Sequence, residues 1–366
     1  MKIAIVDADL IGRKNHRFPN LACMKLSSYH KMLGNDVVLE QNYNNLHNYD
    51  KILISKVFTD TVVPEEVLNM KNVEYGGTGF YYDKAPKLPD DIEHIFPDYH
   101  LYDDFVKEQI KKGVKPKDLK EYTDVSIGFT TRGCIRQCKF CVNQNYKKAS
   151  VHSRIEEFYD PTRKYICLLD DNIFACKDWK QVFDELIATG HKFYFKQGMD
   201  ERLLTDEKCE YLFNKANWYG DYTFAFDNIK DREIIEKKLQ MIREHTDKQC
   251  RFYVFCGFNH NDPGIYSDEF WKNDIADLFE RISILMKYKC LPYIMRYMDY
   301  EKSPFRGMYI DIARWCNQPS FFKKKTFREF CITNGKESSC MKYAKYFEQQ
   351  CPDIAEKYYD LRFTNK

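Results

Sequence analysis

Three cysteines lie close together near the middle of the 366-residue chain: Cys134, Cys138 and Cys141, in the stretch RGCIRQCKFC. Because only three and then two residues separate them, their thiolates can surround one compact metal centre. A structural zinc site takes four protein ligands, and an ordinary 4Fe-4S cluster takes four cysteines. A centre with three protein ligands leaves one metal position open, which indicates a catalytic site rather than a structural one.

The cysteine group also allows two simpler interpretations. A zinc ion could be completed by His152 or Cys167, or the thiols could lie together by accident in a chain with 14 cysteines. Most of the 14 are expected to be buried apolar side chains, because disulfides are rare in a reducing compartment. The aromatic Phe140 directly precedes the third cysteine. Accident does not explain this further coincidence, and we favour the open metal centre.

The composition of the whole chain is that of a folded globular protein with a nearly balanced charge. Hydrophobic residues make up 44% of the chain and aromatic residues 16%, and the formal net charge is +2. This balance gives the whole molecule no electrostatic signature of a dedicated nucleic-acid or membrane binder, so any such role must be local. The first residues, MKIAIVDADL, do not match a signal peptide, and no apolar run approaches the roughly 18 residues of a membrane span. We therefore expect a cytoplasmic protein without a membrane partner.

Residues 1–105 alternate strand and helix patterns. A buried strand at residues 2–6 precedes an amphipathic helix, for which Asn20 is a suitable N-cap and Gly34 a suitable C-cap. Further strands are expected at VVLE, KILISKVF and VEYGG. This alternation predicts a Rossmann-like parallel sheet with helices on its faces.

The rest of the chain predicts a second α/β domain and a helical extension. Residues 81–123 are rich in Pro, Asp and Lys and indicate a linker with a short helix. Six strand patterns separated by helical segments follow, and they predict a partial (β/α)6 barrel, since a full TIM-type barrel has eight units. We expect domains at 1–105 and 106–300 and a mainly helical extension at 301–366. The six strand patterns are VSIGFT, YICLLD, KFYFKQ, YTFAFD, RFYVFC and PYIMRY.

Polar side chains follow each of these six strands. Ligands of parallel βα folds bind at the carboxyl ends of the strands, because the loops converge there. Asp and Asn at such positions also cap the next helix, and for Asp227, Asn228 and Asp231 this interpretation is at least as good. Gln197 and Arg202 are not preferred N-cap residues and fit it poorly. Besides the three cysteines, the strand-end residues are Asp170, Asp171, Asn172, Gln197, Asp200, Arg202, Asp227, Asn228, Asn259, His260 and Arg296.

The segment CIRQCKFC resembles the CxxxCxΦC signature of the radical S-adenosylmethionine (SAM) superfamily, in which Φ is aromatic. This resemblance implies a partial (β/α)6 barrel, which the six strand patterns suggest independently. It also implies that Cys134, Cys138 and Cys141 hold a 4Fe-4S cluster whose open iron binds SAM. One electron then cleaves SAM to methionine and a 5′-deoxyadenosyl radical, which abstracts hydrogen from the substrate. An electron donor such as flavodoxin or ferredoxin is implied by this chemistry.

The same resemblance assigns side chains to SAM. Phe140 would lie beside the adenine. Family members commonly bind the methionyl amino group with a Gly-Glu pair at the end of the second strand, where this chain has LLDDNIFA. Asp170 or Asp171 would supply the carboxylate that the ammonium group needs.

Two further segments, FKQGMDERLL and FAFDN, are similar to the third and fourth strands of the subgroup with an N-terminal cobalamin-binding-type domain. By that similarity Gln197, Arg202 and Asp227 contact SAM or the substrate. As an alternative, Arg202 pairs with its neighbours Asp200 or Glu201.

The segments NLACMKLSSYHKMLGNDVVL and YGGTGF are similar to the Rossmann-like cobalamin domain of that subgroup. The DxHxxG motif that supplies a histidine to cobalt is absent, and His16 stands outside such a context. We therefore expect no cobalamin. The GGTG turn lacks the strand–GxGxxG–helix context of a nucleotide site, and we interpret it as a sharp turn.

The C-terminal segment RWCNQPSFFKKKTFREFC mixes basic and aromatic residues. This composition suits stacking on RNA bases, and it also suits a buried aromatic face with a solvated basic face, which we favour. The spacings between Cys316, Cys331, Cys340 and Cys351 are loose, so we expect buried thiols here rather than an auxiliary cluster.

These patterns favour a radical SAM enzyme that acts on an unidentified substrate, either RNA or a small molecule. The alternative within the superfamily is a radical methyltransferase or methylthiotransferase. The alternative of another class is a zinc-stabilised, non-catalytic RNA-binding protein, although a structural zinc needs none of the polar strand ends.

Overall fold

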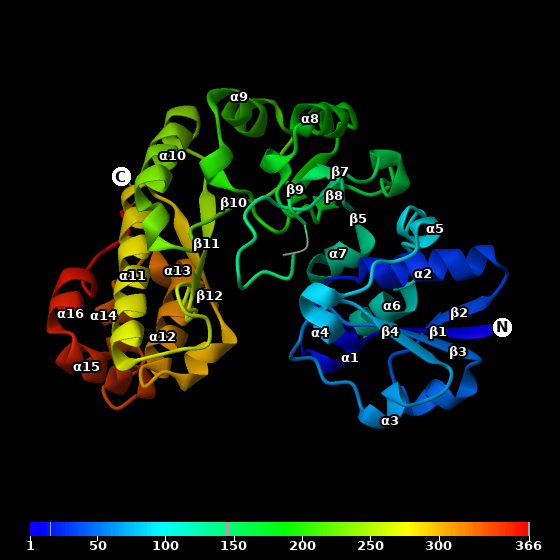
Figure 1. The fold of residues 1–366 in the computed structure, drawn as a ribbon, viewed down its shortest axis with the longest axis horizontal. Helices are drawn as coiled ribbons and strands as arrows, with labels where there is room; N and C mark the ends of the chain where they lie inside the picture. Colours follow the sequence, from blue (N-terminus) through cyan, green and yellow to red (C-terminus); the bar gives the residue numbers. More distant parts are fainter. Residues whose placement is uncertain (15, 144–145, 365–366) are drawn as a thin grey trace. The chain divides into compact units, whose positions relative to one another are not determined.

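The computed structural model describes residues 1–14, 16–143 and 146–364. It shows a mixed α/β protein with parallel sheets and many helices, as the sequence predicts (Figure 1). Across these described ranges, each helix is too short or too polar to span a bilayer.

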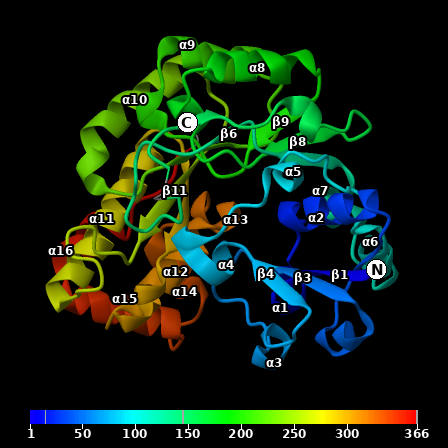
Figure 2. The same ribbon diagram turned by 45° about the vertical axis from the view of Figure 1, so that its right-hand side comes forward.

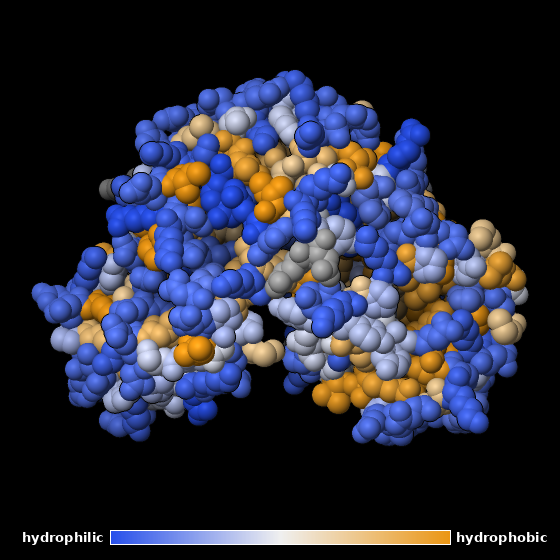
Figure 3. All heavy atoms as spheres, viewed as in Figure 1, coloured by the Kyte–Doolittle hydropathy of each residue, from blue (hydrophilic) through white to orange (hydrophobic). Residues whose placement is uncertain are grey.

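The chain divides into two compact units. The first contains residues 1–170 and 176–194, and the second contains residues 171–175 and 195–366. The domain boundaries expected near residues 105 and 300 stay predictions. The visible surface of both units is mostly hydrophilic, with smaller apolar areas (Figure 3).

The first unit begins with a four-stranded parallel sheet in the order β2-β1-β3-β4. Five of the six residues of the central strand β1 are buried, because packed segments cover both faces of the sheet. The parallel sheet expected near the N-terminus is therefore confirmed. The strands are β1 (Lys2–Asp7), β2 (Asp36–Leu39), β3 (Lys51–Ser55) and β4 (Val73–Gly76).

One face of this sheet, which carries Ile3 and Ile5, packs against α2 (Leu21–Met32) and α6 (Asp103–Lys111) (Figure 2). The opposite face packs against the segments that contain Leu46 and Val67. The segment around α6 is expected from the sequence to be a linker with a short helix, yet its apolar residues share the core of the sheet.

The helix expected between Asn20 and Gly34 is confirmed. The Asn20 side chain accepts a hydrogen bond from the backbone N–H of Cys23 at 3.3 Å, and Gly34 follows the helix with φ of +74°. The remaining elements of the first unit are α1 (Ala8–Gly12), η1 (Tyr43–Asn48), α3 (Glu65–Leu68), α4 (Thr78–Tyr81), η2 (Tyr82–Lys84), α5 (Asp90–Glu93), η3 (Pro116–Leu119), α7 (Lys120–Thr123), β6 (Thr131–Arg132), β7 (Ser150–Val151), η4 (Ile155–Glu157) and α8 (Trp179–Ala188).

All six strands expected after the linker are present, in two groups of three. In one group β5 pairs in parallel with β8, and β9 lies beside β8. In the other, β11 pairs in parallel with both β10 and β12. Closure of the six strands into one partial barrel stays a prediction. The strands are β5 (Val125–Gly128), β8 (Tyr165–Leu168), β9 (Lys192–Phe195), β10 (Tyr222–Ala225), β11 (Cys250–Cys256) and β12 (Leu291–Arg296).

Helices make up most of the rest of the second unit. The Asn317 side chain, directly after α12, exchanges hydrogen bonds of 2.7 and 3.1 Å with the backbone of Ile294, so it covers the outer edge of β12. The elements are η5 (Ile173–Ala175), η6 (Glu201–Leu203), α9 (Asp206–Cys209), the π-helical η7 (Glu210–Lys215), η8 (Ile229–Asp231), α10 (Arg232–His245), α11 (Asp268–Lys287), η9 (Met298–Lys302), α12 (Arg306–Cys316), α13 (Pro319–Phe322), α14 (Phe327–Thr333), α15 (Ser339–Gln350) and α16 (Pro352–Tyr358).

Arg281 ties α11 to the ends of two strands. Its side chain is buried, and its Nη1 donates to the carbonyl oxygens of Phe226, Asp227 and Phe255 at 3.0, 3.0 and 2.8 Å. The positive charge of this side chain is therefore solvated by backbone oxygens instead of water.

Replacing Arg281 with methionine leaves these buried oxygens without their donor. We expect Arg281→Met to lower the free energy of unfolding by about 3 kcal/mol. Urea denaturation measures this, with Arg232→Met at an exposed position as the control, expected to change stability by about 1 kcal/mol or less. An unchanged denaturation midpoint for Arg281→Met would contradict the structural role of this arginine.

Candidate active site

The three clustered cysteines lie on the loop between β6 and β7, and two residues separate β6 from the end of β5. The antiparallel pairing of β6 with β7 closes the base of this cysteine loop. Gly133 has φ of +98°, and a Cβ atom there would lie 2.2 Å from the carbonyl oxygen of Lys148, so only glycine allows this approach. Beside the third cysteine, the Tyr82 hydroxyl donates to the carbonyl oxygen of Phe140 at 2.5 Å. The loop is thus anchored at both places.

The thiols of the cysteine loop differ from the other thiols in their exposure. All three are partly exposed, whereas ten of the other eleven cysteines are buried. The Sγ atom of Cys134 accepts the backbone N–H of Arg136, and that of Cys141 accepts the N–H of Asn143, both at 3.4 Å. Hydrogen bonds to sulfur stabilise thiolate ligands and tune the potential of iron–sulfur clusters. The partial exposure and these hydrogen bonds fit thiolate ligands of a cluster.

The described part of the chain contains no group of three or more His, Cys, Asp or Glu side chains at metal-binding distances, so the three sulfurs do not form a closed site in this conformation. The side chains considered as a fourth zinc ligand are engaged elsewhere. Cys167 is fully buried in a core cluster with Val125 and Ile127. The Nε2 atom of His152 lies 3.6 Å from Oε1 of Glu93, and burial lowers the pKa of His152 to about 4.

Asp170, two residues beyond β8, is buried and already saturated with hydrogen bonds. Its carboxylate accepts the backbone N–H and the hydroxyl of Thr130 at 2.8 and 2.6 Å, and those of Thr131 at 2.8 and 2.7 Å. Burial raises the pKa of Asp170 to about 6, although these four bonds favour the carboxylate. Asp170 therefore fixes the two residues that lead into the cysteine loop.

The other carboxylate considered for the SAM amino group is Asp171, and its side chain is partly exposed. Phe140 is also partly exposed, and Gln197 is exposed to solvent after β9. Contacts of these three side chains with SAM stay predictions.

Arg202 forms two ion pairs within the second unit. Its Nε atom lies 2.7 Å from Oδ1 of Asp200, and its Nη1 atom lies 2.6 Å from Oδ2 of Asp231. Burial alone would lower the pKa of Arg202, but the bond to Asp200 and the nearby carboxylates raise it. The pairing with Asp200, offered as an alternative from the sequence, is confirmed, while contact with SAM or the substrate stays a prediction.

The two residues Asp227 and Asn228, which follow β10, make different hydrogen bonds. The Asn228 side chain accepts the backbone N–H of Lys230 at 3.0 Å, so the capping interpretation is confirmed there. Asp227 instead accepts the N–H of Phe255 at 3.2 Å and connects the ends of β10 and β11. Burial raises the pKa of Asp227 to about 6, while the nearby Arg281 lowers it.

Glu201 is a buried carboxyl group that the sequence patterns do not single out. It has no exposed surface, its Oε2 accepts the N–H of Ala225 at 3.2 Å, and its Oε1 is buried without a hydrogen-bond partner within the described ranges. Burial, and then the charge of Asp200, raise the pKa of Glu201 to about 8. A neutral carboxyl group therefore lies next to the Arg202 ion pairs at neutral pH.

This raised pKa predicts a pH dependence of stability. Between about pH 5 and pH 8 the unfolded state has lost the proton of Glu201 while the folded state keeps it, so stability falls by about 1 kcal/mol per pH unit as pH rises. Denaturation across this window should show the slope reduced in Glu201→Gln and retained in the exposed control Glu233→Gln. An identical pH profile for wild type and Glu201→Gln would rule the assignment out.

The structure also tests the predictions for the GGTG segment and for the basic, aromatic C-terminal segment. Gly77 has φ of +107°, and a Cβ atom there would lie 2.3 Å from the carbonyl oxygen of Lys56, so the GGTG segment is confirmed as a sharp turn. Four aromatic rings of the basic C-terminal segment, those of Trp315, Phe322, Phe327 and Phe330, are at most 2% exposed, whereas Phe321 is partly exposed. The core interpretation is therefore confirmed for these four rings, which are too buried to stack on RNA bases.

Comparisons with known proteins add one finding about the fold. No protein-family model matches the sequence, and no curated protein matches it. The fold is similar to a solved structure of a radical SAM methyltransferase, TsrM, from Kitasatospora setae, with tryptophan substrate and a SAM analogue (aza-SAM) bound. The TM-score is 0.52 at 10% sequence identity, over 80% of this chain and 72% of that chain. The likeness establishes a shared fold.

Proposed function

We propose that this protein is a radical SAM enzyme in which Cys134, Cys138 and Cys141 hold a 4Fe-4S cluster with one open iron. The observation that carries the proposal is the CxxxCxΦC loop between β6 and β7, whose three thiols are partly exposed. The fold likeness to a radical SAM methyltransferase also supports it.

When bound, the cluster supplies the electron that cleaves SAM to methionine and a 5′-deoxyadenosyl radical for hydrogen abstraction. The residues of this chain bind and orient the reactants. Asp170 holds the base of the cysteine loop through Thr130 and Thr131. Because the oxygens of Asp170 already accept four hydrogen bonds, Asp171 is the better carboxylate for the methionyl ammonium group.

Phe140 is proposed to lie against the adenine. Gln197 and the Arg202 network are proposed to contact SAM or the substrate, with Asp200 and Asp231 fixing the guanidinium. A flavodoxin or ferredoxin is the proposed electron donor. Without a DxHxxG motif, cobalamin is not included.

A radical methyltransferase is the second candidate, because the similar solved structure is of a radical SAM methyltransferase. Hydrogen abstraction leaves 5′-deoxyadenosine as the SAM product, whereas methyl transfer leaves S-adenosylhomocysteine. The substrate of either reaction is unidentified.

The proposal is tested with full-length protein reconstituted anaerobically with iron and sulfide. After reduction in the presence of SAM, the products are separated by liquid chromatography. We expect 5′-deoxyadenosine only when reductant and cluster are both present. A colourless protein that retains one zinc ion and forms no nucleoside product would instead support a zinc-stabilised binding protein.

A further inference from the structure

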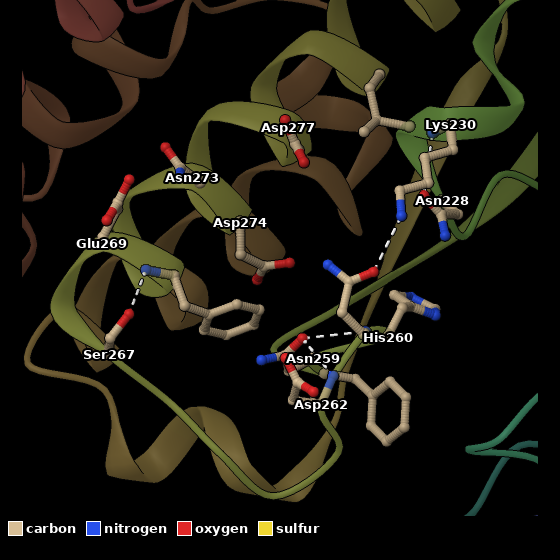
Figure 4. Close-up of a pocket in the computed structure, with 14 residues that line it drawn as sticks. Asn228, Lys230, Asn259, His260, Asp262, Ser267, Glu269, Asn273, Asp274 and Asp277 are labelled. Atoms are coloured by element: carbon tan, nitrogen blue, oxygen red, sulfur yellow. Dashed lines mark hydrogen bonds between the residues drawn. The ribbon is translucent and has the colours of Figure 1, made fainter.

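The second unit contains a pocket that the proposed SAM chemistry does not use. Its volume is about 320 Å³, at the lower end of the roughly 300–1000 Å³ typical of small-molecule sites. It is lined by the loops that follow β10 and β11 and by one side of α11 (Figure 4). The carboxyl ends of parallel strands are where open α/β sheets bind ligands, so the place of this pocket is typical of a binding site.

The lining of the pocket is acidic. Four carboxyl groups, those of Asp262, Glu269, Asp274 and Asp277, line it together with one lysine, Lys230. The Nζ atom of that lysine already donates to Oδ1 of Asn261 at 3.0 Å. An anionic ligand would therefore meet several carboxylates and a cation that is already engaged, whereas a cationic ligand finds the charge it needs.

Of the three pocket carboxyl groups on α11, that of Glu269 is exposed, and those of Asp274 and Asp277 differ in their hydrogen bonds. Oδ2 of Asp274 accepts the backbone N–H of Gly257 at 2.8 Å and the hydroxyl of Tyr309 at 2.7 Å. Asp277 is half-buried, and no described residue donates a hydrogen bond to its carboxylate. Burial raises the pKa of Asp277, while the nearby charge of Arg281 lowers it. Both side chains extend from α11 toward the space that Lys230 and His260 border (Figure 4). Of the two less exposed carboxylates, Asp277 is therefore the one whose oxygens are left for a ligand.

The kind of cation follows from the rest of the lining. Metal-binding groups of three His, Cys, Asp or Glu side chains do not occur in the ranges that the structure describes, this pocket included. The rings of Phe258 and Phe270 and the amides of Asn228 and Asn273 also line it, which gives a mixture of apolar contacts and hydrogen-bonding groups. Burial lowers the pKa of His260, so this imidazole adds no positive charge at neutral pH.

We propose that this pocket binds a small organic amine, with Asp277 as the carboxylate that receives its ammonium group. Asn273, one helical turn before Asp277 on α11, lies on the same side of the helix. The amine proposal does not depend on the cysteine loop. If the pocket binds no amine, the proposed SAM chemistry is unaffected, and if the SAM chemistry is wrong, the amine proposal is unaffected.

The test uses two five-carbon probes of opposite charge, 1,5-diaminopentane and glutarate. Isothermal titration calorimetry of the full-length protein at neutral pH and physiological salt is expected to show one site for the diamine and no binding of glutarate. Asp277→Asn is expected to weaken diamine binding at least about tenfold, because a charge-assisted hydrogen bond is lost. Asp268→Asn removes the same charge from an exposed residue of α11 that does not line the pocket, and it is expected to change binding less than about twofold, since salt screens exposed charges.

A second variant guards against a folding defect in Asp277→Asn. Asn273→Lys places a positive charge at the exposed edge of the pocket and is expected to abolish diamine binding without changing the urea denaturation midpoint. Any of three results would overturn the proposal. These are glutarate binding as tight as that of the diamine, no saturable diamine binding to the wild type, or unchanged diamine binding in both pocket variants.

Discussion

Replacing Cys138 with alanine is expected to reduce the iron content of the anaerobically reconstituted protein from about four atoms per chain to near zero. A 4Fe-4S cluster with only three protein ligands has no spare thiolate, so the loss of one leaves two irons without protein support. The thiol of Cys138 is partly exposed on the cysteine loop, and its removal leaves no cavity in the core. Metal analysis measures the effect, together with the visible absorption of the brown cluster.

Cys351→Ala is the matched control, because Cys351 is also partly exposed and lies far from the cysteine loop in the sequence. This control is expected to retain full iron content and full release of 5′-deoxyadenosine. If Cys138→Ala kept its iron and its nucleoside product, the assignment of the three ligands would be wrong.

The second large effect is expected at Asp170. In Asp170→Asn one carboxylate oxygen becomes an amide nitrogen, which faces backbone N–H groups and hydroxyls of Thr130 and Thr131 that need an acceptor. We expect the free energy of unfolding to fall by about 3 kcal/mol. Because these threonines lead directly into the cysteine loop, we also expect the reconstituted cluster to be lost faster to an iron chelator. Denaturation and the rate of iron release under anaerobic conditions measure the two effects.

Two controls separate positioning of the loop from general instability. Asp184→Asn makes the same chemical change at an exposed position of α8 and is expected to alter neither quantity. Arg281→Met is expected to be destabilising to a similar extent in the second unit, while iron release stays at the wild-type rate. Equal acceleration of iron release in Arg281→Met and Asp170→Asn would show that Asp170 acts only through stability.

The secondary structure could be predicted where the local pattern is strong. The helix after Asn20 carries its own cap signals, and the six strands after the linker are short, mainly apolar segments bounded by polar turns. The prediction of a linker at residues 81–123 is only partly right. Its Pro, Asp and Lys residues mark the turns, but the apolar side chains Tyr99, Phe105 and Tyr122 between them pack in the core of the N-terminal sheet.

The candidate site could be predicted only in part, for a physical reason. The cysteine loop is a local pattern, and its spacing is visible in the sequence. Asp170 and Asp171 are adjacent and chemically identical. Only the fold shows that the carboxylate of Asp170 accepts hydrogen bonds from Thr130 and Thr131. Glu201 is also hidden in the sequence, because a glutamate next to Asp200 looks like part of a solvated acidic pair until its burial is known.

The central claim is that three cysteines hold an iron–sulfur cluster with one iron open to SAM, and electron paramagnetic resonance tests it most directly. Spectra of the reduced, reconstituted protein are recorded with and without SAM. The account predicts a reduced-cluster signal whose g values change when SAM is added, because SAM becomes a ligand of the open iron. A cluster signal that SAM leaves unchanged, or a protein that binds zinc and no iron, would contradict it.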